Sequence, residues 1–538
     1  MTAATSSSAS PAPPPFLGRE HRRRQFLRAA LVGVLAGAAA LLFQLAVQGA
    51  QTLGRGWGAW ARAAGLWGTL PLVAATAGLG AAAAWLTGRF APEAGGSGIP
   101  HVKAALLSLR VIRPLRLVLV KFVGGFLALA AGMSLGREGP TIQIGAAAGQ
   151  FVGKALKVRR RSMPALVAAG GGAGLAAAFN APLAGFVFVM EELKREMSAL
   201  TYGAALAASV CAVAALRLAA GQEPSFSLAD PGAAPLKALP LVALVGAAGG
   251  LFGVLFNKTL LAVGAARTRL RVPRWAAGAA LGALGGLALV FAPQLTGTGH
   301  DVAQRLLAGR FEAADVVLAA FVLACGKLLF TALSYGTGVP GGIFAPILMM
   351  GAAFGLAAGT LLAALLPGAG VSPSVFATIG MVAVLAGSVR APLTGVVLIV
   401  EMTGEYGLLY ALLLGAFAAY LAAEAVRDKP IYDKLLDLDV RRDHPAPPPE
   451  GGAEVLEALV EPGSAFDGRV VADLGLGPHV LLATVQRRGR SIVPHGGTLI
   501  LAGDELTLVV EATATPETAL RLLASTRAGG GDERKDER

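Results

Sequence analysis

The sequence predicts an all-α polytopic membrane protein with an internal repeat, followed by a small soluble α+β domain. Of its 538 residues, 55% are hydrophobic and only 15% are charged, whereas soluble proteins carry about 25% charged residues. Strand-like alternation replaces the apolar runs beyond residue 453. Crossing a bilayer takes about 17–25 residues. Runs of that length include 26–47, 70–86, 316–333 and 408–426.

The net charge of +13 suits a membrane protein better than a nucleic-acid-binding one, and no nucleic-acid partner is expected. Basic residues gather at the ends of apolar runs, as at 22–24 and 159–161, and such residues favour the cytoplasmic side. We therefore expect a multi-pass protein of the inner cell membrane whose N- and C-termini are cytoplasmic.

The chain offers no signal for metal, redox or enzyme chemistry. Cys211 and Cys325 stand alone in apolar segments, and the six histidines lack ligand spacing. The sequence also contains no P-loop and no nucleophile–base constellation. We expect neither an enzyme, nor a metal site, nor a cofactor.

Composition divides the chain into five segments. The predicted order is a disordered leader (1–24), a membrane domain (25–436), a Pro-rich linker (437–453), a soluble domain (454–527) and a charged tail (528–538). Within the soluble domain, strands are expected at 480–485 and 505–510 and a helix at 516–523.

A faint repeat runs through the membrane domain. Four motifs recur in the same order at offsets of 201 to 210 residues. One such match is expected by chance in a chain this rich in Ala and Gly, but four in register are not. Transporters built from repeats place their sites on interrupted helices at the repeat interface. The matched segments are 96–98 with 297–299, Lys121 with Lys327, 140–149 with 346–355, and 180–191 with 390–401.

Residues 136–140 read Gly-Arg-Glu-Gly-Pro inside an apolar stretch. A charged pair at membrane depth is costly unless it faces a cavity or an ion pathway, and glycine and proline there indicate a broken helix. In the second copy, Ile343 and Phe344 stand where Arg137 and Glu138 stand in the first. The scaffold is therefore common to both copies, whereas the acid belongs to one.

A second acid also lacks a counterpart. Glu191 matches Glu401 across the repeat, but its neighbour Glu192 aligns with Met402. Shared residues are interpreted as scaffold, so the unmatched Glu192 is the better candidate for function.

The glycine-rich breaks each open a helix. Proline suits the first helical turn, and free N–H groups at a helix start bind anions with help from the helix dipole. Several such starts meeting at the midplane predict an anion site without a full positive charge, which suits conduction because binding must be reversible. The breaks lie at 96–100, 136–140 and 341–346.

Together with Tyr432 in the late Lys-Pro-Ile-Tyr segment, these motifs resemble the CLC chloride channel and transporter family over about residues 25–436. The resemblance implies a CLC fold: an inverted repeat of about 16–18 helices, several of them broken, in a homodimer with one pore per subunit. It also implies chloride and protons as the transported ions and the lipid bilayer as the surroundings.

The resemblance also implies site roles. The hydroxyls of Ser97 and Tyr432 and the amides of Ile343 and Phe344 would hold a central chloride. Amides near Arg137, Glu138 and Gly139 would form an outer chloride site, for which the Glu138 carboxylate would compete as gate and proton acceptor. Serine at position 97 goes with chloride preference in this family.

Each role has a plain structural alternative. Glu138 could pair with Arg137, Ser97 could cap a helix, and Tyr432 could be an interfacial tyrosine. Glu192 could sit at a solvated helix end. Lys121 and Lys327 are expected to snorkel or to pair structurally, without contacting the ion.

Glu192 favours proton coupling. The resemblance places an acid there in proton-coupled members, where it takes protons from the cytoplasm, and channels of the family usually lack it. The predicted function is chloride/proton antiport. A passive voltage- or pH-gated chloride channel remains the alternative within the family, and a ligand-sensing membrane protein signalling through its C-terminal domain remains the alternative outside it.

The C-terminal segment resembles the TrkA-C domain of potassium transport regulators over about 455–525. The resemblance implies dimeric regulation, with a nucleotide as a possible ligand. A dimerisation module without a ligand is the alternative, and the sequence assigns no ligand-binding residue.

Overall fold

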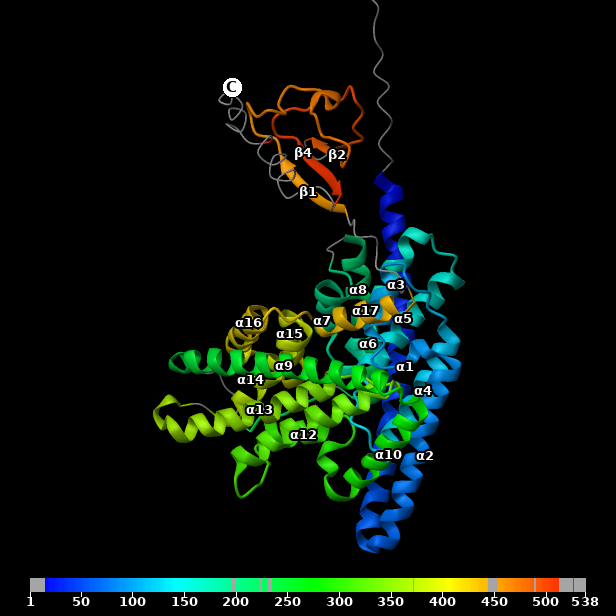
Figure 1. The fold of residues 1–538 in the computed structure, drawn as a ribbon, viewed down its shortest axis with the longest axis vertical. Coiled ribbons are helices and arrows are strands. Elements are labelled where there is room, and N and C mark those ends of the chain that lie inside the picture. Colours follow the sequence, from blue (N-terminus) through cyan, green and yellow to red (C-terminus); the bar gives the residue numbers. More distant parts are fainter. Residues whose placement is uncertain are drawn as a thin grey trace, which may run out of the picture. The chain divides into compact units, whose positions relative to one another are not determined.

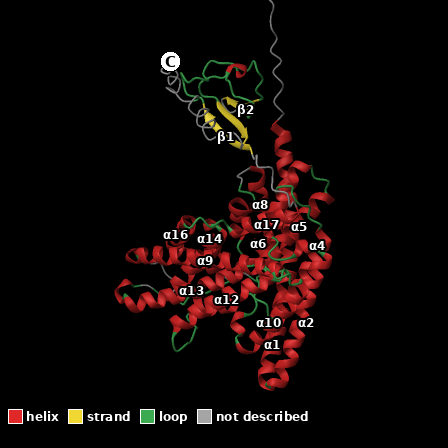
Figure 2. Ribbon diagram, in the orientation of Figure 1, coloured by secondary structure: helices red, strands yellow, loops and turns green. Residues whose placement is uncertain are grey.

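The computed structural model describes residues 15–195, 199–221, 225–229, 235–370, 372–443, 453–487, 490–511 and 526. The chain divides into two compact units, Met1–Asp439 and Val440–Arg538. The first is helical, and the second contains a small β-sheet (Figure 2). The predicted fold class is thereby confirmed.

Seventeen α-helices are described, and eight helices in the described residues are long and apolar enough to cross a membrane. Their order is shown in Figure 1. The bounds are α1 Pro15–Ala64, α2 Leu66–Phe90, α3 Ile99–Leu106, α4 Pro114–Ala130, α5 Glu138–Ala155, α6 Met163–Phe179, α7 Pro182–Phe188, α8 Ala199–Ala220, α9 Leu239–Arg269, α10 Arg274–Phe291, α11 His300–Leu307, α12 Val316–Gly336, α13 Phe344–Leu365, α14 Pro373–Val389, α15 Pro392–Thr403, α16 Leu409–Ala425 and α17 Ile431–Asp443.

Two predicted segment boundaries differ from the helices. Helix α1 begins at Pro15, inside the predicted leader 1–24, and α17 continues to Asp443, inside the predicted linker 437–453. Once a helix exists, each further residue adds a hydrogen bond at little cost, so polar residues prolong helices that apolar packing has started. The predicted helix at 516–523 and the tail at 528–538 lie outside the described residues.

Small residues bring helices close together, in the same way in both halves. A Cβ at Gly145 of α5 would overlap the carbonyl oxygen of Gly170 in α6, and a Cβ at Gly380 of α14 would overlap that of Gly351 in α13. The pairs α5–α6 and α13–α14 are equivalent in the repeat. This close approach is the membrane use of small residues that the composition predicts.

The repeat is inverted at its centre. Gly136 and Gly342 exchange two hydrogen bonds, each amide nitrogen lying 2.7 Å from the other residue's carbonyl oxygen, in an antiparallel bridge. Helix α5 starts two residues after Gly136, and α13 starts two residues after Gly342. The two helix N-termini therefore face each other across a local two-fold axis.

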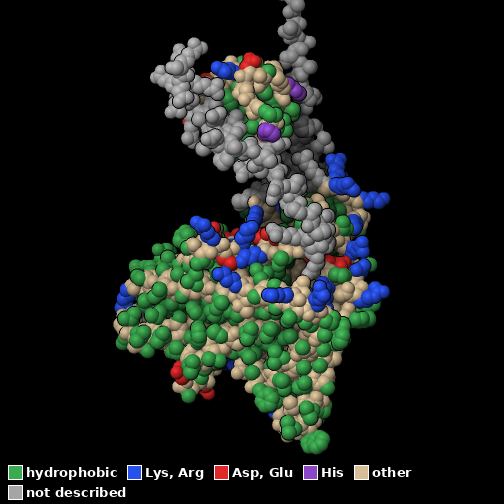
Figure 3. Space-filling model, in the orientation of Figure 1, with side chains coloured by type: hydrophobic (Ala, Val, Ile, Leu, Met, Phe, Trp, Pro, Cys, Tyr) green, Lys and Arg blue, Asp and Glu red, His purple; other side chains and the backbone are tan. Residues whose placement is uncertain are grey.

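The surface of the helical unit fits a lipid environment. Large apolar side chains stand out from it, with Trp67 88% and Leu218 91% exposed, a costly arrangement in water. Figure 3 shows hydrophobic side chains over the flank of this unit, with Lys and Arg gathered along one rim. Such a rim is typical of a membrane–water boundary.

The second unit is built on an antiparallel four-stranded sheet in the order β1-β4-β2-β3. Buried side chains such as Leu482, Val485 and Leu508 form its core, and a bulge lies between Leu482 and Thr484. The strands at 480–485 and 505–510 are confirmed. The bounds are β1 Ala453–Leu459, β2 Val480–Arg487, β3 Arg490–Ile492 and β4 Glu505–Glu511.

One ion pair ties the turn before β4 to β2. The Asp504 carboxylate accepts from Arg487 Nε at 2.7 Å, Arg487 Nη2 at 2.6 Å and the Leu501 amide at 2.8 Å. Burial alone would raise the pKa of Asp504, but these hydrogen bonds outweigh burial and hold the pKa below its ordinary value.

Because the folded-state pKa of Asp504 is lowered, its stabilisation is present above the ordinary carboxyl pKa and is lost as pH falls through the lowered pKa. Asp504→Asn should destabilise this unit at pH 7 by about 2 kcal/mol and remove that part of its acid sensitivity. Hydrogen exchange of the Leu506 and Leu508 amides in the full chain measures both effects. Glu457→Gln, on the exposed face of β1, is the matched control. Equal exchange rates in both variants would contradict the assignment.

Candidate anion and proton site

The Glu138 carboxylate lies at the N-terminus of α13. Its Oε2 accepts a hydrogen bond of 3.3 Å from the Ala345 amide, and the side chain is only 2% exposed. A Cβ at Gly136 would overlap the same carboxylate oxygen, which explains the glycine there. An acid of the first repeat thus caps a helix of the second, where amide groups favour negative charge.

The backbones of both breaks meet at this point. A Cβ at Gly342 would come within 2.8 Å of the Gly139 amide nitrogen, so no other residue fits there. Phe344 opens α13, and its amide has no partner within the helix. The structure brings Glu138, Gly139, Ile343 and Phe344 together, and their role as chloride contacts stays a prediction. The bonded amide is that of Ala345, one residue beyond the predicted pair.

Ser97 lies beside Gly139, since a Cβ at Gly139 would come within 2.7 Å of the Ser97 Cβ. The Ser97 hydroxyl accepts from the Ile99 amide at 3.3 Å, and the Ser97 amide donates to the Tyr335 hydroxyl at 3.4 Å. The Ser97 hydroxyl is therefore hydrogen-bonded at the start of α3, as expected if it caps that helix, and its side chain also interacts with the Tyr335 hydroxyl.

Tyr432, in the first turn of α17, is fully buried rather than interfacial. Within the part of the chain that the structure describes, its hydroxyl has no hydrogen-bond partner. The hydroxyl interacts electrostatically with Glu138, Glu192 and Tyr335. A buried donor without a partner is costly, so this hydroxyl is well suited to meet a bound anion.

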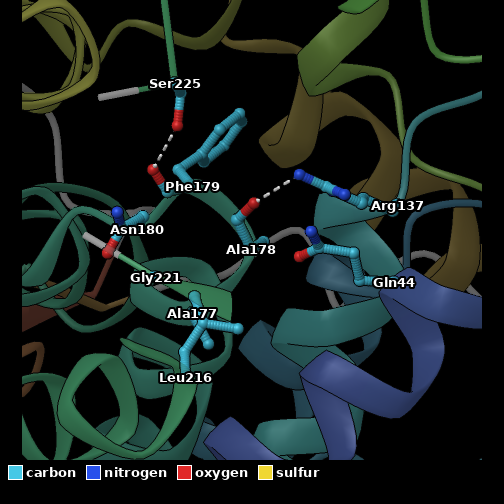
Figure 4. Close-up of a pocket in the computed structure, with 9 residues that line it drawn as sticks. All are labelled: Gln44, Arg137, Ala177, Ala178, Phe179, Asn180, Leu216, Gly221 and Ser225. Atoms are coloured by element: carbon cyan, nitrogen blue, oxygen red, sulfur yellow. Dashed lines mark hydrogen bonds between the residues drawn. The ribbon is translucent and has the colours of Figure 1, made fainter. Parts of the chain in front are cut away.

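Arg137 adjoins a small pocket of about 120 Å³. Its guanidinium donates to the Ala178 carbonyl at 3.0 Å (Figure 4). Its Nε lies 4.0 Å from Glu138 Oε1. The expected alternative of an Arg137–Glu138 pair is therefore present as a long contact, alongside the shorter bond from Ala345. The pocket is lined by Gln44, Arg137, Ala177, Ala178, Phe179, Asn180, Leu216, Gly221 and Ser225.

Glu192 is buried and fully ion-paired rather than solvated. It lies in a π-helical turn, Val189–Leu193, that continues α7, and such turns recur at functional sites. Its side chain is 0% exposed, with Oε1 2.7 Å from Lys103 Nζ and Oε2 3.2 Å from Arg195 Nη2. Both cations also contact Asp433 of α17.

Glu191 points elsewhere and has a structural role that its repeat counterpart mirrors. Its carboxylate accepts from the Leu393 and Thr394 amides at the start of α15, at 3.1 and 2.7 Å. Glu401 accepts from the Leu183 and Ala184 amides at the start of α7, at 3.0 and 2.8 Å. Each half therefore caps a helix of the other, and the interpretation of the matched acids as scaffold agrees with the geometry.

Lys121 and Lys327 do not snorkel, because both are fully buried. Lys121 Nζ donates to the Ala94 and Gly96 carbonyls at 2.7 and 2.8 Å, and Lys327 Nζ donates to the Leu295 and Gly297 carbonyls at 3.0 and 2.9 Å. Each lysine fixes the glycine loop of its own repeat. Snorkelling and structural pairing were the two expected alternatives, and the hydrogen bonds agree with structural pairing.

The counterpart of Ser97 in the second copy has a different partner. Thr298 caps α11 as Ser97 caps α3, but its amide and hydroxyl both lie 3.4 Å from Gln51 Oε1. In the first copy the Tyr335 hydroxyl occupies the corresponding position beside the Ser97 amide. A hydroxyl can also donate a hydrogen bond, whereas the Gln51 oxygen can only accept.

Sequence reasoning missed Tyr335, Lys103, Arg195 and Asp433. Of these, Lys103 could have been found from the sequence, because it is a lysine inside the short apolar segment that follows the first glycine break. Asp433 directly follows Tyr432, yet an acid at a helix start is ordinary by itself.

The family model described as "Voltage gated chloride channel" matches residues 79–424. The chain belongs to this voltage-gated chloride channel family. The family match contains both glycine breaks of the inverted centre, and the TrkA-C domain matches residues 455–522 of the second unit.

Within the chloride channel family, the H(+)/Cl(-) exchange transporter ClcA of Vibrio vulnificus (strain YJ016) is 39% identical over 426 residues, covering 77% of this chain and 90% of that protein. The crystal structure of a slow cyanobacterial Cl-/H+ antiporter aligns with a TM-score of 0.74 at 34% identity, over 78% of this chain and 99% of that one. A eukaryotic CLC transporter aligns at 0.64 and 24% identity over 79% and 75%, which supports the fold alone.

The reciprocal caps give a stability prediction for this family member. Glu401→Gln removes the charge but keeps one acceptor for the α7 amides, so we expect a loss of about 1 kcal/mol and a lower midpoint of thermal unfolding in detergent. Glu405→Gln, in the turn after α15, serves as the matched control. If both variants unfold at the same temperature, the cap contributes nothing to stability.

Proposed function

We propose that the protein is a secondary active antiporter that exchanges chloride for protons across the membrane. One observation carries the proposal: the Glu138 carboxylate occupies the N-terminus of α13, the place where helix amides would hold an anion. A carboxylate there competes with chloride while charged and gives way when protonated. Chloride and the charged carboxylate then exclude each other at one position, so chloride binding there is coupled to protonation of Glu138, which is what exchange requires.

The hydroxyl groups of Tyr432 and Ser97 support the same proposed function. The unpartnered Tyr432 hydroxyl and the Ser97 hydroxyl supply neutral donors for chloride, so binding stays reversible. Chloride is the first choice because Ser97 stands where the family resemblance associates serine with chloride.

Glu192 favours exchange over a passive channel. It is completely buried, and Tyr432 interacts electrostatically with both Glu192 and Glu138. A buried acid that does not compete with chloride has no evident role in a channel. In a proton path such an acid is expected. Relatives whose names describe H+/Cl- exchange support this choice.

The setting of the proposed activity follows from the same features. We place the protein in the inner cell membrane with both termini cytoplasmic, because the N-terminal arginines lie on that side under the positive-inside rule. We further propose a homodimer with one pore per subunit. Neither catalysis of a chemical reaction nor a cofactor is part of the proposal.

The TrkA-C domain is proposed to regulate transport. Its ligand, a nucleotide or otherwise, is an outcome for experiment, since no residue of the sheet is assigned to one. Transport by the whole chain and by one truncated after residue 443, compared with and without candidate nucleotides, tests this role.

Reconstitution tests the function directly. Purified protein in liposomes is given a chloride gradient, and proton movement is recorded with a pH-sensitive dye. Antiport predicts that outward chloride flow drives protons uphill into the liposomes. Chloride flow without uphill proton movement would establish a channel, and no flow of either ion would favour a sensor.

A further inference from the structure

Glu192 and three charged side chains around it, Lys103, Arg195 and Asp433, form a closed ring. Lys103 Nζ lies 2.7 Å from Glu192 Oε1 and 2.5 Å from Asp433 Oδ1. Arg195 Nη2 lies 3.2 Å from Glu192 Oε2 and 2.9 Å from Asp433 Oδ2. Each cation bridges both acids, and each acid uses one oxygen for each cation. Among the residues that the structure describes, the charged groups that face Glu192 are thus Lys103 from α3, Arg195 after the π turn and Asp433 from α17.

The ring has a buried side and an open side. The side chains of Glu192 and Lys103 are 0% and 7% exposed, whereas those of Asp433 and Arg195 are 25% and 48% exposed. Arg195 has a positive φ of 52°, where the helical turn ends, and its side chain folds back to the acid three residues earlier. Solvent therefore meets Asp433 and Arg195 first, and both oxygens of Glu192 are occupied while the ring is closed.

Charge balance gives Asp433 a specific task. With both acids ionised the ring is neutral, and protonating Glu192 leaves a single positive charge. Without Asp433 the two cations would face Glu192 alone, and its protonation would leave two positive charges close together in a buried place. Asp433 therefore lowers the electrostatic cost of protonating Glu192, and it also holds the two cations in position.

We propose that Asp433 is a positioning residue for proton transfer: it closes the ion-pair ring around Glu192, and the ring opens on its Arg195 side when Glu192 takes up a proton. The proposal rests on the proposed antiport. It also gives α17 two tasks, because Asp433 directly follows Tyr432, whose hydroxyl is proposed to bind chloride. A shift of this helix start would act on both ions together.

Asp433→Asn tests the proposal in the reconstituted protein. Glu192 then faces two uncompensated cations and holds on to its charge, so the pH profile of proton transport should move towards acid by about one unit. Proton flux at pH 7 should fall about tenfold, and the number of chlorides moved per proton should rise. Asp433→Glu restores the charge and should bring the profile back towards that of the unmodified chain.

Two controls separate positioning from a merely structural role. Asp437 lies one turn further along α17, and its ion pair in the described part of the chain is with the exposed Lys429 at 3.9 Å. Asp437→Asn should therefore leave the profile unchanged. In a Glu192→Gln background, Asp433→Asn should have no further effect on chloride flux, because Asp433 acts through Glu192. An unshifted profile in Asp433→Asn, or an equal additional loss in the double variant, would overturn the proposal. If the unmodified chain moves no protons, the proposed function fails instead.

Discussion

Replacing Glu138 with alanine should abolish proton transport and leave chloride transport running without coupling. The carboxylate is the side chain that meets the α13 N-terminus, where it accepts from the Ala345 amide. Without it that amide is free for chloride, and no titratable group remains at the meeting point of the two helix starts. We expect proton flux to drop by a hundredfold or more, about the contribution of a positioned proton-transfer group. Ion-selective and pH electrodes on the same liposomes measure both fluxes.

Glu138→Gln makes this test sharper. The glutamine amide keeps the size of the carboxyl group and can still accept from Ala345, but it cannot titrate. Proton flux should be lost as in the alanine variant, while chloride flux should be slower because the plug stays in place. Proton coupling that survives in either variant would remove Glu138 from the proton path.

Glu192→Gln should also end proton coupling, with chloride flux retained. Glu192 lies apart from the meeting point of α5 and α13, within the ring formed with Lys103, Arg195 and Asp433. Its loss should therefore cut the supply of protons without opening or closing the anion path. The expected loss of proton flux is again about a hundredfold, recorded as proton movement under a fixed chloride gradient.

The neighbouring acid provides the matched control. Glu191→Gln changes the same functional group one residue away, but Glu191 bonds to the start of α15. It should lower thermal stability and leave the ratio of chloride to protons unchanged. Loss of coupling in Glu191→Gln as well would mean that disturbance of the π turn, rather than removal of one acid, causes the effect.

The sequence was sufficient for the parts of the site that lie close together along the chain. The Gly-Arg-Glu-Gly-Pro break, the glycine break before Ser97 and the second break at Ile343 are local signals, because glycine, proline and charge are all out of place in an apolar run. Comparing the two copies then separated Glu138 from its scaffold. That the N-termini of α5 and α13 meet was only an expectation, because the sequence offset between two copies does not reveal that the copies are inverted.

The ion-pair ring could not be predicted in this way. Lys103 meets partners 89 and 330 residues away, and neither separation leaves a trace in local composition. The same holds for Gln51, which fills the place of Tyr335 in the second repeat from 247 residues away. The burial of Lys121 and Lys327 was not predicted either, because only the folded chain shows that carbonyl oxygens of the preceding glycine loops replace water around them.

The reciprocal helix caps also have a consequence for the synthesis of the protein. The α7 amides bond to Glu401, and Glu191 bonds to the start of α15. Each pair is separated by 202 to 218 residues, so the second partner is synthesised long after the first. At a synthesis rate of about 5–20 residues per second, that wait is roughly 10–40 seconds. During this time the native partners of these groups have not yet been made. The first repeat therefore acquires its reciprocal caps only after the second repeat has been synthesised.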